Sequence, residues 1–536
     1  MTINIQLNKQ RFQKVKSFLI EKDLLFITIF LTVAAIISFF IFYTSGLALA
    51  YNDARSHLDI GRRVVEGLKP GIAQLGSVWL PLPHVLMVPT IWNDFMWHTG
   101  LSGALISMLS FVGTGVLIYL ILKNLNVGPL GRIIAVLIFA LNINILYLQS
   151  TAMTELLLIF TMTAAVYDLM QWAKTERIVY VIRSSFWIML STLVRYDGWF
   201  LLIFSAFIIA ILLIKSRGYK VTEGTLILFL TLGGFGIFLW VVWNLLIFGD
   251  PLYFAFGPFS ARAQQSQLEE AGVLSTKGNI LFSLKMYLYA MVYNTGAFQA
   301  ITGFVGAIVL WMDKNTKTSV RIASSALMAP FLFNVLALFM GHSVLFIQGL
   351  SGNTWFNVRY GAMMIPTVAV FTGYLISKVK GLRYTIAGLF IAVTFFAFAN
   401  VDAVTIDDAR VGSSQKNVSE VSSWLKQNTE DEPGFILISA ASHDAIIFSS
   451  GLPMKKYIHE GTGAYWESAT TSPDRWAKWI VMRTNDTNDL AFKLTQESGQ
   501  LEKYNKVQSF PFADIYELKR EYWQQVNTTP TLGKQK

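Results

Sequence analysis

Residues 24–57 read LLFITIFLTVAAIISFFIFYTSGLALAYNDARSH, and this stretch decides the class of fold. Its first part, Leu24 to Ala50, is apolar over more than the roughly 20 residues needed to cross a bilayer core of about 30 Å. That run is too long for the apolar part of a signal peptide, and no small-residue cleavage site follows it. We therefore expect a retained membrane anchor, after which a polar segment with Asp53 leaves the lipid.

Similar apolar blocks recur through the first 400 residues. Of all 536 residues, 54% are hydrophobic and 14% are charged, whereas an ordinary soluble domain has about 25% charged residues. Lipid must therefore be the main solvent, and we predict a polytopic α-helical membrane protein. About eleven membrane-spanning helices are expected, near 24–50, 101–122, 133–149, 153–172, 182–194, 198–214, 224–248, 286–311, 322–346, 360–377 and 384–400. The absence of cysteine excludes disulfides, thiolate nucleophiles and cysteine metal sites.

The basic residues predict the orientation of the chain in the membrane. A basic flank precedes the first span, and the positive-inside tendency places it in the cytoplasm: Lys9, Arg11, Lys14, Lys16 and Lys22. The later connections expected on the same side are also basic, so the net charge of +10 reflects topology and contact with anionic lipids, not nucleic acid. We expect a multi-pass protein of a cytoplasmic membrane, of prokaryotic type, with a cytoplasmic N-terminus and an extracytoplasmic C-terminus.

Three long connections fall on the predicted outer face, at residues 51–100, 249–284 and 347–359. We expect function to collect there, within a transmembrane catalytic domain of residues 1–400. From residue 401 the composition turns polar, and alternating runs such as Phe435 to Ile438 and Trp479 to Met482 predict strands. Residues 401–536 are therefore predicted to form a small extracytoplasmic α/β domain.

Asp53 and Glu155 are the candidate catalytic acids. Asp53 directly follows the first span, where a carboxylate would be held firmly; an alternative is that Asn52 or Asp53 caps a helix. Glu155 stands at the outer end of an apolar span, where ionisable groups usually face a cavity, although Thr151 and Glu155 also fit a capping box. His57 lies four residues after Asp53, a spacing that allows either a metal pair or a simple Asp–His hydrogen bond.

The candidate anion-binding residues lie on two other outer segments. Arg359 and Tyr360 enter the membrane from the side where topology disfavours positive charge, so Arg359 needs an anionic partner such as a phosphate, unless it snorkels to lipid headgroups. Arg195 and Asp197 lie between two short spans, where a buried salt bridge is the simpler interpretation. His342 ends the preceding span and is a possible accessory residue.

Together these segments resemble the GT-C superfamily of polyprenyl-phosphate-dependent glycosyltransferases, especially prokaryotic relatives of protein O-mannosyltransferases and of lipid A aminoarabinose transferases. The resemblance covers nearly the whole chain. It rests on the order and spacing of five segments: Asp53 ahead of Leu58-Asp59-Ile60-Gly61-Arg62, Met153-Thr154-Glu155, Leu193-Val194-Arg195-Tyr196-Asp197-Gly198, Asp250-Pro251-Leu252-Tyr253 and Asn357-Val358-Arg359-Tyr360.

The resemblance implies transfer of a sugar from a polyprenyl-phosphate donor to a hydroxyl of a protein, lipid or glycan. Asp53 would be the general base, Glu155 would position acceptor or sugar, and Arg359, with Arg195 and Tyr360, would hold the donor phosphate. Many relatives carry two adjacent acids in the first loop, whereas Asn52-Asp53-Ala54 has one, so no cofactor is certain and a divalent metal is not established. The competing hypotheses are a lipid or polysaccharide flippase or transporter, and a surface-polysaccharide polymerase or ligase.

Overall fold

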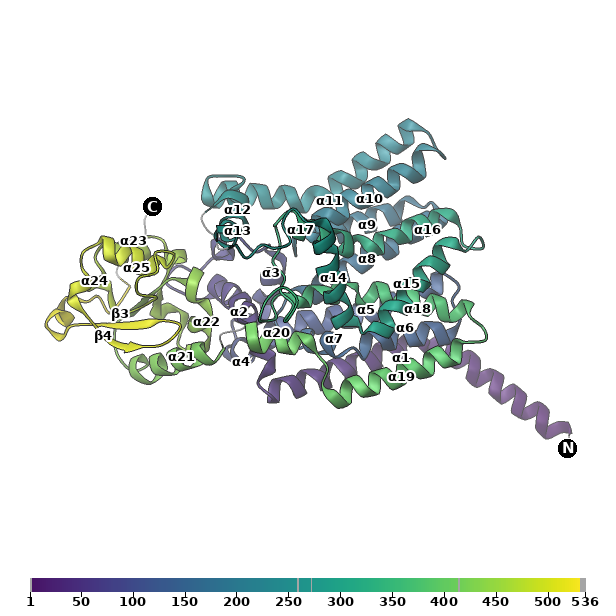
Figure 1. Ribbon diagram of the computed structural model, residues 1–536, viewed down its shortest axis with the longest axis horizontal. Coiled ribbons are helices and arrows are strands. Elements are labelled where there is room, and N and C mark those ends of the chain that lie inside the picture. The colour runs from purple at the N-terminus through teal and green to yellow at the C-terminus, as the bar shows by residue number, and fades with distance from the viewer. Residues whose placement is uncertain (1, 258–259, 271, 413–414, 531–536) are drawn as a thin grey trace.

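The computed structural model describes residues 2–257, 260–270, 272–412 and 415–530. Helices make up most of the chain, and a small sheet lies near its C-terminal end (Figure 1). The helices of the first 400 residues are α1 Thr2–Thr44, α2 Asn52–Val65, α3 Leu82–Ile91, α4 Asp94–His98, α5 Leu101–Asn124, α6 Pro129–Ala140, α7 Ile143–Leu148, α8 Glu155–Thr175, α9 Ile178–Thr192, α10 Asp197–Ile214, α11 Tyr219–Phe248, α12 Tyr253–Phe256, α13 Ala261–Glu270, α14 Ile280–Thr295, α15 Ala297–Met312, α16 Thr318–Ser324, α17 Ala329–Phe339, α18 Ile365–Lys378 and α19 Arg383–Asn400. The later elements are α20 Val404–Gly412, α21 Gln415–Thr429, β1 Phe435–Ile438, α22 Ala440–Ser450, β2 Tyr457–Ile458, α23 Ala464–Thr471, α24 Pro473–Trp476, β3 Ala477–Met482, α25 Leu490–Glu497, β4 Tyr504–Ser509 and β5 Asp514–Leu518.

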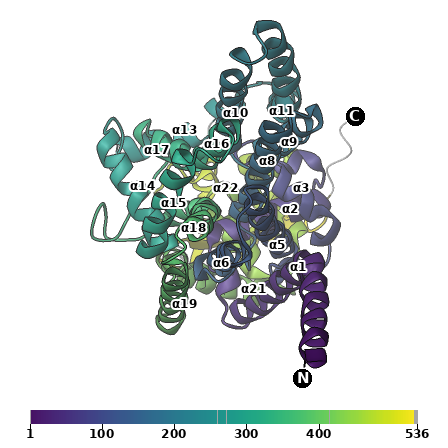
Figure 2. The same ribbon diagram turned by 90° about the vertical axis from the view of Figure 1, so that its right-hand side faces the viewer.

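The polytopic architecture is confirmed. Among the described residues, eight helices are long and apolar enough to cross a membrane, and a bent pair raises the number to nine. The two other expected spans, near 133–149 and 182–194, correspond to the shorter apolar helices α6 and α9. Viewed from the side opposite the sheet, the spans form one bundle, from which α10 and α11 project (Figure 2).

Two spans differ from their expected form. The first helix ends at Thr44 and not near residue 50, because Gly46 adopts φ 74°, and a short 3-10 turn, Leu47–Leu49, leads to α2. The span expected at 286–311 is broken into α14 and α15, which meet at an angle of 111°. Gly296, with φ 84° and ψ 142°, stands at the break, where its backbone cannot continue a helix.

The sheet has five strands in the order β2-β1-β3-β5-β4, with β1 parallel to β2 and β3, and β5 antiparallel to β3 and β4. β1 and β3 are buried along their whole length, which fits a sheet covered on both faces. Alternate residues of these strands enter different cores: Ile436 and Val481 join the main cluster that continues into the spanning helices, whereas Leu437 and Ile480 pack in a separate cluster. The spanning bundle and one face of the sheet therefore share a continuous apolar core.

Candidate functional site

Asp53 lies in the first turn of α2, directly after the first span. The residue at the N-cap of α2 is Tyr51, and no side chain caps that end. Neither Asn52 nor Asp53 therefore caps this helix. The carboxylate of Asp53 instead forms an ion pair with another residue. That partner is Arg359, whose Nη2 lies 2.6 Å from Oδ2 of Asp53.

Arg359 contacts three acidic residues from distant parts of the chain. It belongs to the 3-10 helix η4, Val358–Met364, which starts after Asn357 in the left-handed conformation at φ 56°. Besides Asp53, its guanidinium contacts Oε1 of Glu155 at 3.1 Å and Oδ2 of Asp408 at 3.7 Å. Planar guanidinium groups suit such multiple carboxylate contacts, so Arg359 joins α2, α8 and α20.

Arg195 forms the second cationic centre, next to the first. Its Nη1 lies 3.5 Å from Oε1 of Glu155, and its Nε lies 3.4 Å from Oδ2 of Asp197. The Tyr360 ring lies between the two arginines: its centroid is 4.7 Å from the guanidinium carbon of Arg195 and 5.3 Å from that of Arg359. The salt bridge expected between Arg195 and Asp197 is present, and it belongs to a larger network.

We define the charged cluster as these acids and bases: Asp53, Glu155, Arg195, Asp197, Arg359 and Asp408. Its members differ in access to solvent: the side chain of Glu155 is 0% exposed and that of Arg359 is 6% exposed, whereas Arg195 is 22% and Asp53 43% exposed. A ligand would therefore reach Asp53 and Arg195 first. The side chains of Glu155 and Arg359 are buried beneath these two residues.

Sequence reasoning missed Asp408 and Tyr51. The hydroxyl of Tyr51 donates to Oδ2 of Asp408 at 3.1 Å or to the carbonyl oxygen of Thr405 at 2.8 Å, so this pair ties the end of the last span to the start of α2. Burial, followed by repulsion from Asp408, raises the pKa of Tyr51 well above its ordinary value, so the phenol stays neutral. The available signal was the acidic pair Asp407-Asp408 directly after an apolar span, which resembles the position of Asp53.

His57 and His342 lie apart from the network of charges. His57 does not bond to Asp53; its Nδ1 lies 2.8 Å from Nε2 of His84 on α3, and its ring packs against Trp79. Burial lowers the pKa of His57 to about 3, so its imidazole is neutral. His342 contacts α13, where its Nδ1 lies 3.3 Å from Oε1 of Gln265. Among the described residues, no group of three His, Asp or Glu side chains has the arrangement of a metal site.

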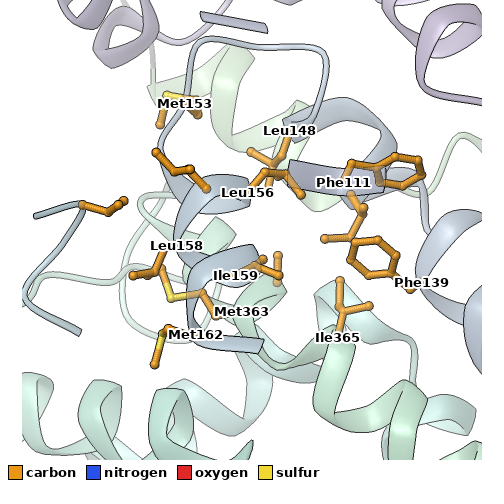
Figure 3. Packing of buried hydrophobic residues seen from close by; sticks show 14 of the residues in the cluster. Phe111, Phe139, Leu148, Met153, Leu156, Leu158, Ile159, Met162, Met363 and Ile365 are labelled. Carbon is orange, nitrogen blue, oxygen red and sulfur yellow. The ribbon is translucent and has the colours of Figure 1, made fainter. Parts of the chain in front are cut away.

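An apolar pocket lies further along the helices that carry Glu155 and Arg359. It is lined by α8, α17, α18 and the turn between α16 and α17, and its walls include Leu158, Met162 and Met363, which lie beside one another in Figure 3. Leu158 and Met162 follow Glu155 by three and seven residues, which is about 5 and about 10 Å along a helix. The cluster and the pocket therefore share two structural elements.

Solved structures with a similar fold are found for this chain, but the sequence comparisons find no relative. No family model and no curated protein matches this chain. ArnT from Cupriavidus metallidurans bound to undecaprenyl phosphate matches with a TM-score of 0.53 and 11% identity, over 92% of this chain and 98% of that chain. ArnT from the same organism in the apo state matches with a TM-score of 0.54 and 10% identity, over 88% and 94% of the two chains.

A third solved structure, the archaeal oligosaccharyltransferase AglB from Archaeoglobus fulgidus with an inhibitory peptide and a dolichol-phosphate, has a TM-score of 0.46 and 12% identity, over 94% of this chain and 75% of that chain. That similarity is too low to support an argument. The alignments with the two ArnT structures cover most of this chain and nearly all of the ArnT chains. The chain therefore shares the fold of these ArnT structures.

Proposed function

We propose that this protein is a membrane glycosyltransferase that moves a sugar from a polyprenyl-phosphate donor to an acceptor hydroxyl on the extracytoplasmic face. The observation that carries the proposal is the meeting of Asp53, Glu155 and Arg359, which lie 102 or more residues apart in sequence, at one end of the spanning bundle. The similarity of fold to ArnT supports the same class of reaction. Because these charges lie at the first residues of α8 and η4, away from the middle of any span, the arrangement favours an enzyme over a transporter.

In the proposed reaction, the bond between C1 of the sugar and the phosphate oxygen breaks, and its electron pair leaves with the phosphate. The acceptor oxygen forms the new bond to C1 and gives its proton to the carboxylate of Asp53. Arg195 and Arg359 stabilise the charge that develops on the leaving phosphate, and Tyr360 fixes the two guanidinium groups relative to one another. Glu155 holds both arginines in place from beneath.

Asp53 is bound to Arg359 in this structure, so its carboxylate is occupied before a donor arrives. We propose that the donor phosphate replaces Asp53 at Arg359 and thereby releases the base. The polyprenyl chain would then lie between the spanning helices, on the side of α8 where Leu158 and Met363 form an apolar surface. Its sugar would face the exposed side of the cluster, where the acceptor arrives.

The test is transfer of radiolabelled sugar from a panel of synthetic polyprenyl-phosphate sugars, with purified protein in nanodiscs and membrane extract as the source of acceptors. Asp53→Asn should bind donor at least as tightly as wild type, because no carboxylate then competes for Arg359, and should lose roughly a hundredfold or more of the transfer rate, as expected when a general base is removed. Glu269→Gln, which changes an exposed acid of α13 paired with Lys277, is the matched control and should retain full activity. Full transfer by Asp53→Asn would refute the base assignment, and no transfer from any donor by folded wild type would refute the proposed reaction.

A further inference from the structure

Helix α2 connects the charged cluster to the C-terminal sheet region. Asp53 stands at one end of this helix, and Arg63 stands at the other, ten residues or about 15 Å away. Arg63 contacts Asp444 of α22 with both nitrogens of its fork: Nη1 to Oδ1 at 2.9 Å and Nη2 to Oδ2 at 3.5 Å. Both side chains are nearly buried, with 11% and 10% exposed, so this ion pair is shielded from water.

A second acid from α2 enters the same contact. Asp59 precedes Arg63 by one helical turn and is 0% exposed. Its Oδ1 accepts a hydrogen bond from Nε1 of Trp97 at 3.2 Å, whereas its Oδ2 has no donor among the described residues. This unpaired oxygen is buried one helical turn from the Arg63–Asp444 pair, and the carboxyl groups of Asp59 and Asp444 interact electrostatically, so one proton held between them would satisfy both.

We propose that Asp59, Arg63 and Asp444 form an interlock, sharing one proton, that fixes α2 against the C-terminal sheet region and so positions Asp53 for transfer. These three are positioning residues, because none of them contacts the charged cluster directly. The inference rests on the proposed function for its link to transfer. The contact between α2 and α22 stands independently of that function.

A rigid helix transmits displacement from one end to the other. The last turn of α2 is also bound to α3, because Arg62, next to Arg63, donates to the carbonyl oxygens of Ile91 and Trp92. Because Arg62 stays bound, loss of the interlock would let α2 tilt about this residue, and Asp53 at the other end of the helix would move relative to Arg359. A shift of about 1 Å in a catalytic group is enough to reduce a rate on the order of a hundredfold.

The shared proton makes the interlock sensitive to pH. Burial and then repulsion from Asp444 raise the pKa of Asp59 well above its ordinary value, and burial raises the pKa of Asp444 to about 6, against the opposing effect of Arg63. Below the raised pKa the shared proton is present and stabilises the interlock. The proton is lost as pH rises above about 6, so the interlock should weaken there.

Other titratable groups surround the interlock from each neighbouring element. Tyr457 of β2 acts on Asp59, Glu460 acts on Asp444, and His84 of α3 and His459 both lie close enough to Arg63 to feel its charge. Burial lowers the pKa of both histidines well below its ordinary value and raises that of Glu460. Both histidines and Tyr457 therefore stay neutral between about pH 6 and about pH 8. Glu460 accepts hydrogen bonds from the hydroxyl of Ser439 and the amide of Ala440.

Hydrogen–deuterium exchange of the α2 peptide, in the full chain in nanodiscs, tests the interlock without reference to activity. We expect Arg63→Gln and Asp444→Asn to speed exchange of α2 about tenfold, and the charge exchange Arg63→Asp with Asp444→Arg to restore at least part of the protection. Asp59→Asn, which supplies an N–H donor in place of the shared proton, should keep α2 protected and remove the difference between about pH 6 and about pH 8. Asp474→Asn is the matched control, because Asp474 is a nearly buried acid paired with Lys503 away from α2.

Transfer kinetics then test the positioning role. Arg63→Gln should lower kcat about tenfold or more with an unchanged KM for the donor, whereas a general loss of folded protein would lower activity without any recovery in the charge-exchanged variant. Unchanged exchange of α2 in both Arg63→Gln and Asp444→Asn would overturn the interlock. Faster exchange together with a wild type that transfers no sugar would preserve the interlock and refute the proposed function.

Discussion

Replacement of Arg359 by glutamine should expose how strongly the charged cluster depends on a single guanidinium. The change removes the 2.6 Å contact with Asp53, the 3.1 Å contact with Glu155 and the 3.7 Å contact with Asp408. The three losses are unequal. Asp53 is 43% exposed and can be hydrated, so its contribution should be below about 1 kcal/mol. Asp408 is buried but keeps the hydroxyl of Tyr51, and its contact with Arg359 is the longest of the three, so its loss should be smaller than that of Glu155.

The main loss falls on Glu155. Its side chain is 0% exposed, its Oε2 has no donor among the described residues, and after the change only Arg195 remains, at 3.5 Å. Removing one partner of a buried ion pair costs about 3 to 5 kcal/mol, mainly because the remaining charge is left without compensation. Adding Glu155→Gln removes that charge, so Arg359→Gln with Glu155→Gln should recover most of the loss.

The assay is thermal unfolding in nanodiscs, followed by the fluorescence of the 15 tryptophans, with the three proteins ranked by Tm. We expect wild type to be the most stable, the double variant to lie close below it, and Arg359→Gln to be clearly the least stable. Arg217→Gln removes a pair with Glu176 in which both side chains are more than half exposed, and it should change little. A melting temperature for Arg359→Gln equal to that of wild type, or no recovery in the double variant, would refute the buried network.

Three further predictions use other parts of the structure. Arg195→Gln should weaken donor binding about tenfold, measured with radiolabelled polyprenyl phosphate, and should also lower Tm, because it removes the arginine contact of Asp197, whose side chain is 2% exposed. Gly306→Ala should lower Tm or prevent expression of folded protein, because a Cβ there would lie 2.0 Å from the carbonyl oxygen of Phe371, whereas Gly388→Ala meets nothing within 4 Å and should be neutral. Bonding to His443 and to backbone amides lowers the pKa of Asp489 in spite of burial, so its contribution to stability should be full above about pH 4 and be lost on further acidification; Asp489→Asn should flatten this acid limb of a Tm-against-pH curve.

The spanning architecture could be predicted from sequence because the bilayer imposes a length on every apolar block. The departures are at places where backbone conformation decides, such as Gly46 and Gly296, whose dihedral angles are not implied by hydropathy. Exposed apolar residues such as Leu246 and Leu281 are ordinary in a protein whose solvent is lipid. Hydropathy therefore located the spans well and their ends and bends less well.

The charged cluster was predictable in part for a different reason. Asp53, Glu155, Arg195 and Arg359 each break an apolar pattern at the end of a block, so the cost of burying a charge singles them out. Asp408 stands in a segment that already contains other charged residues, so it does not interrupt an apolar pattern. His57 has a spacing that suggested a partnership with Asp53, yet His84 is its partner, because packing of α2 against α3 decides the neighbour and sequence separation does not.

The balance of charge in the cluster bears on how a donor could bind. Four carboxyl groups, those of Asp53, Glu155, Asp197 and Asp408, share two guanidinium groups, so an anionic phosphate cannot simply be added to a site that already has too few positive charges. Of the four acids, Asp53 alone is substantially exposed, at 43%, so it is the one that can leave its arginine for water at little cost. In the proposed reaction, exchange of Asp53 for the donor phosphate would keep Arg359 neutralised throughout and would leave Glu155, Asp197 and Asp408 undisturbed. The same exchange would turn Asp53 from the partner of a guanidinium into a free carboxylate, so in the proposed reaction the arrival of the donor would itself create the base.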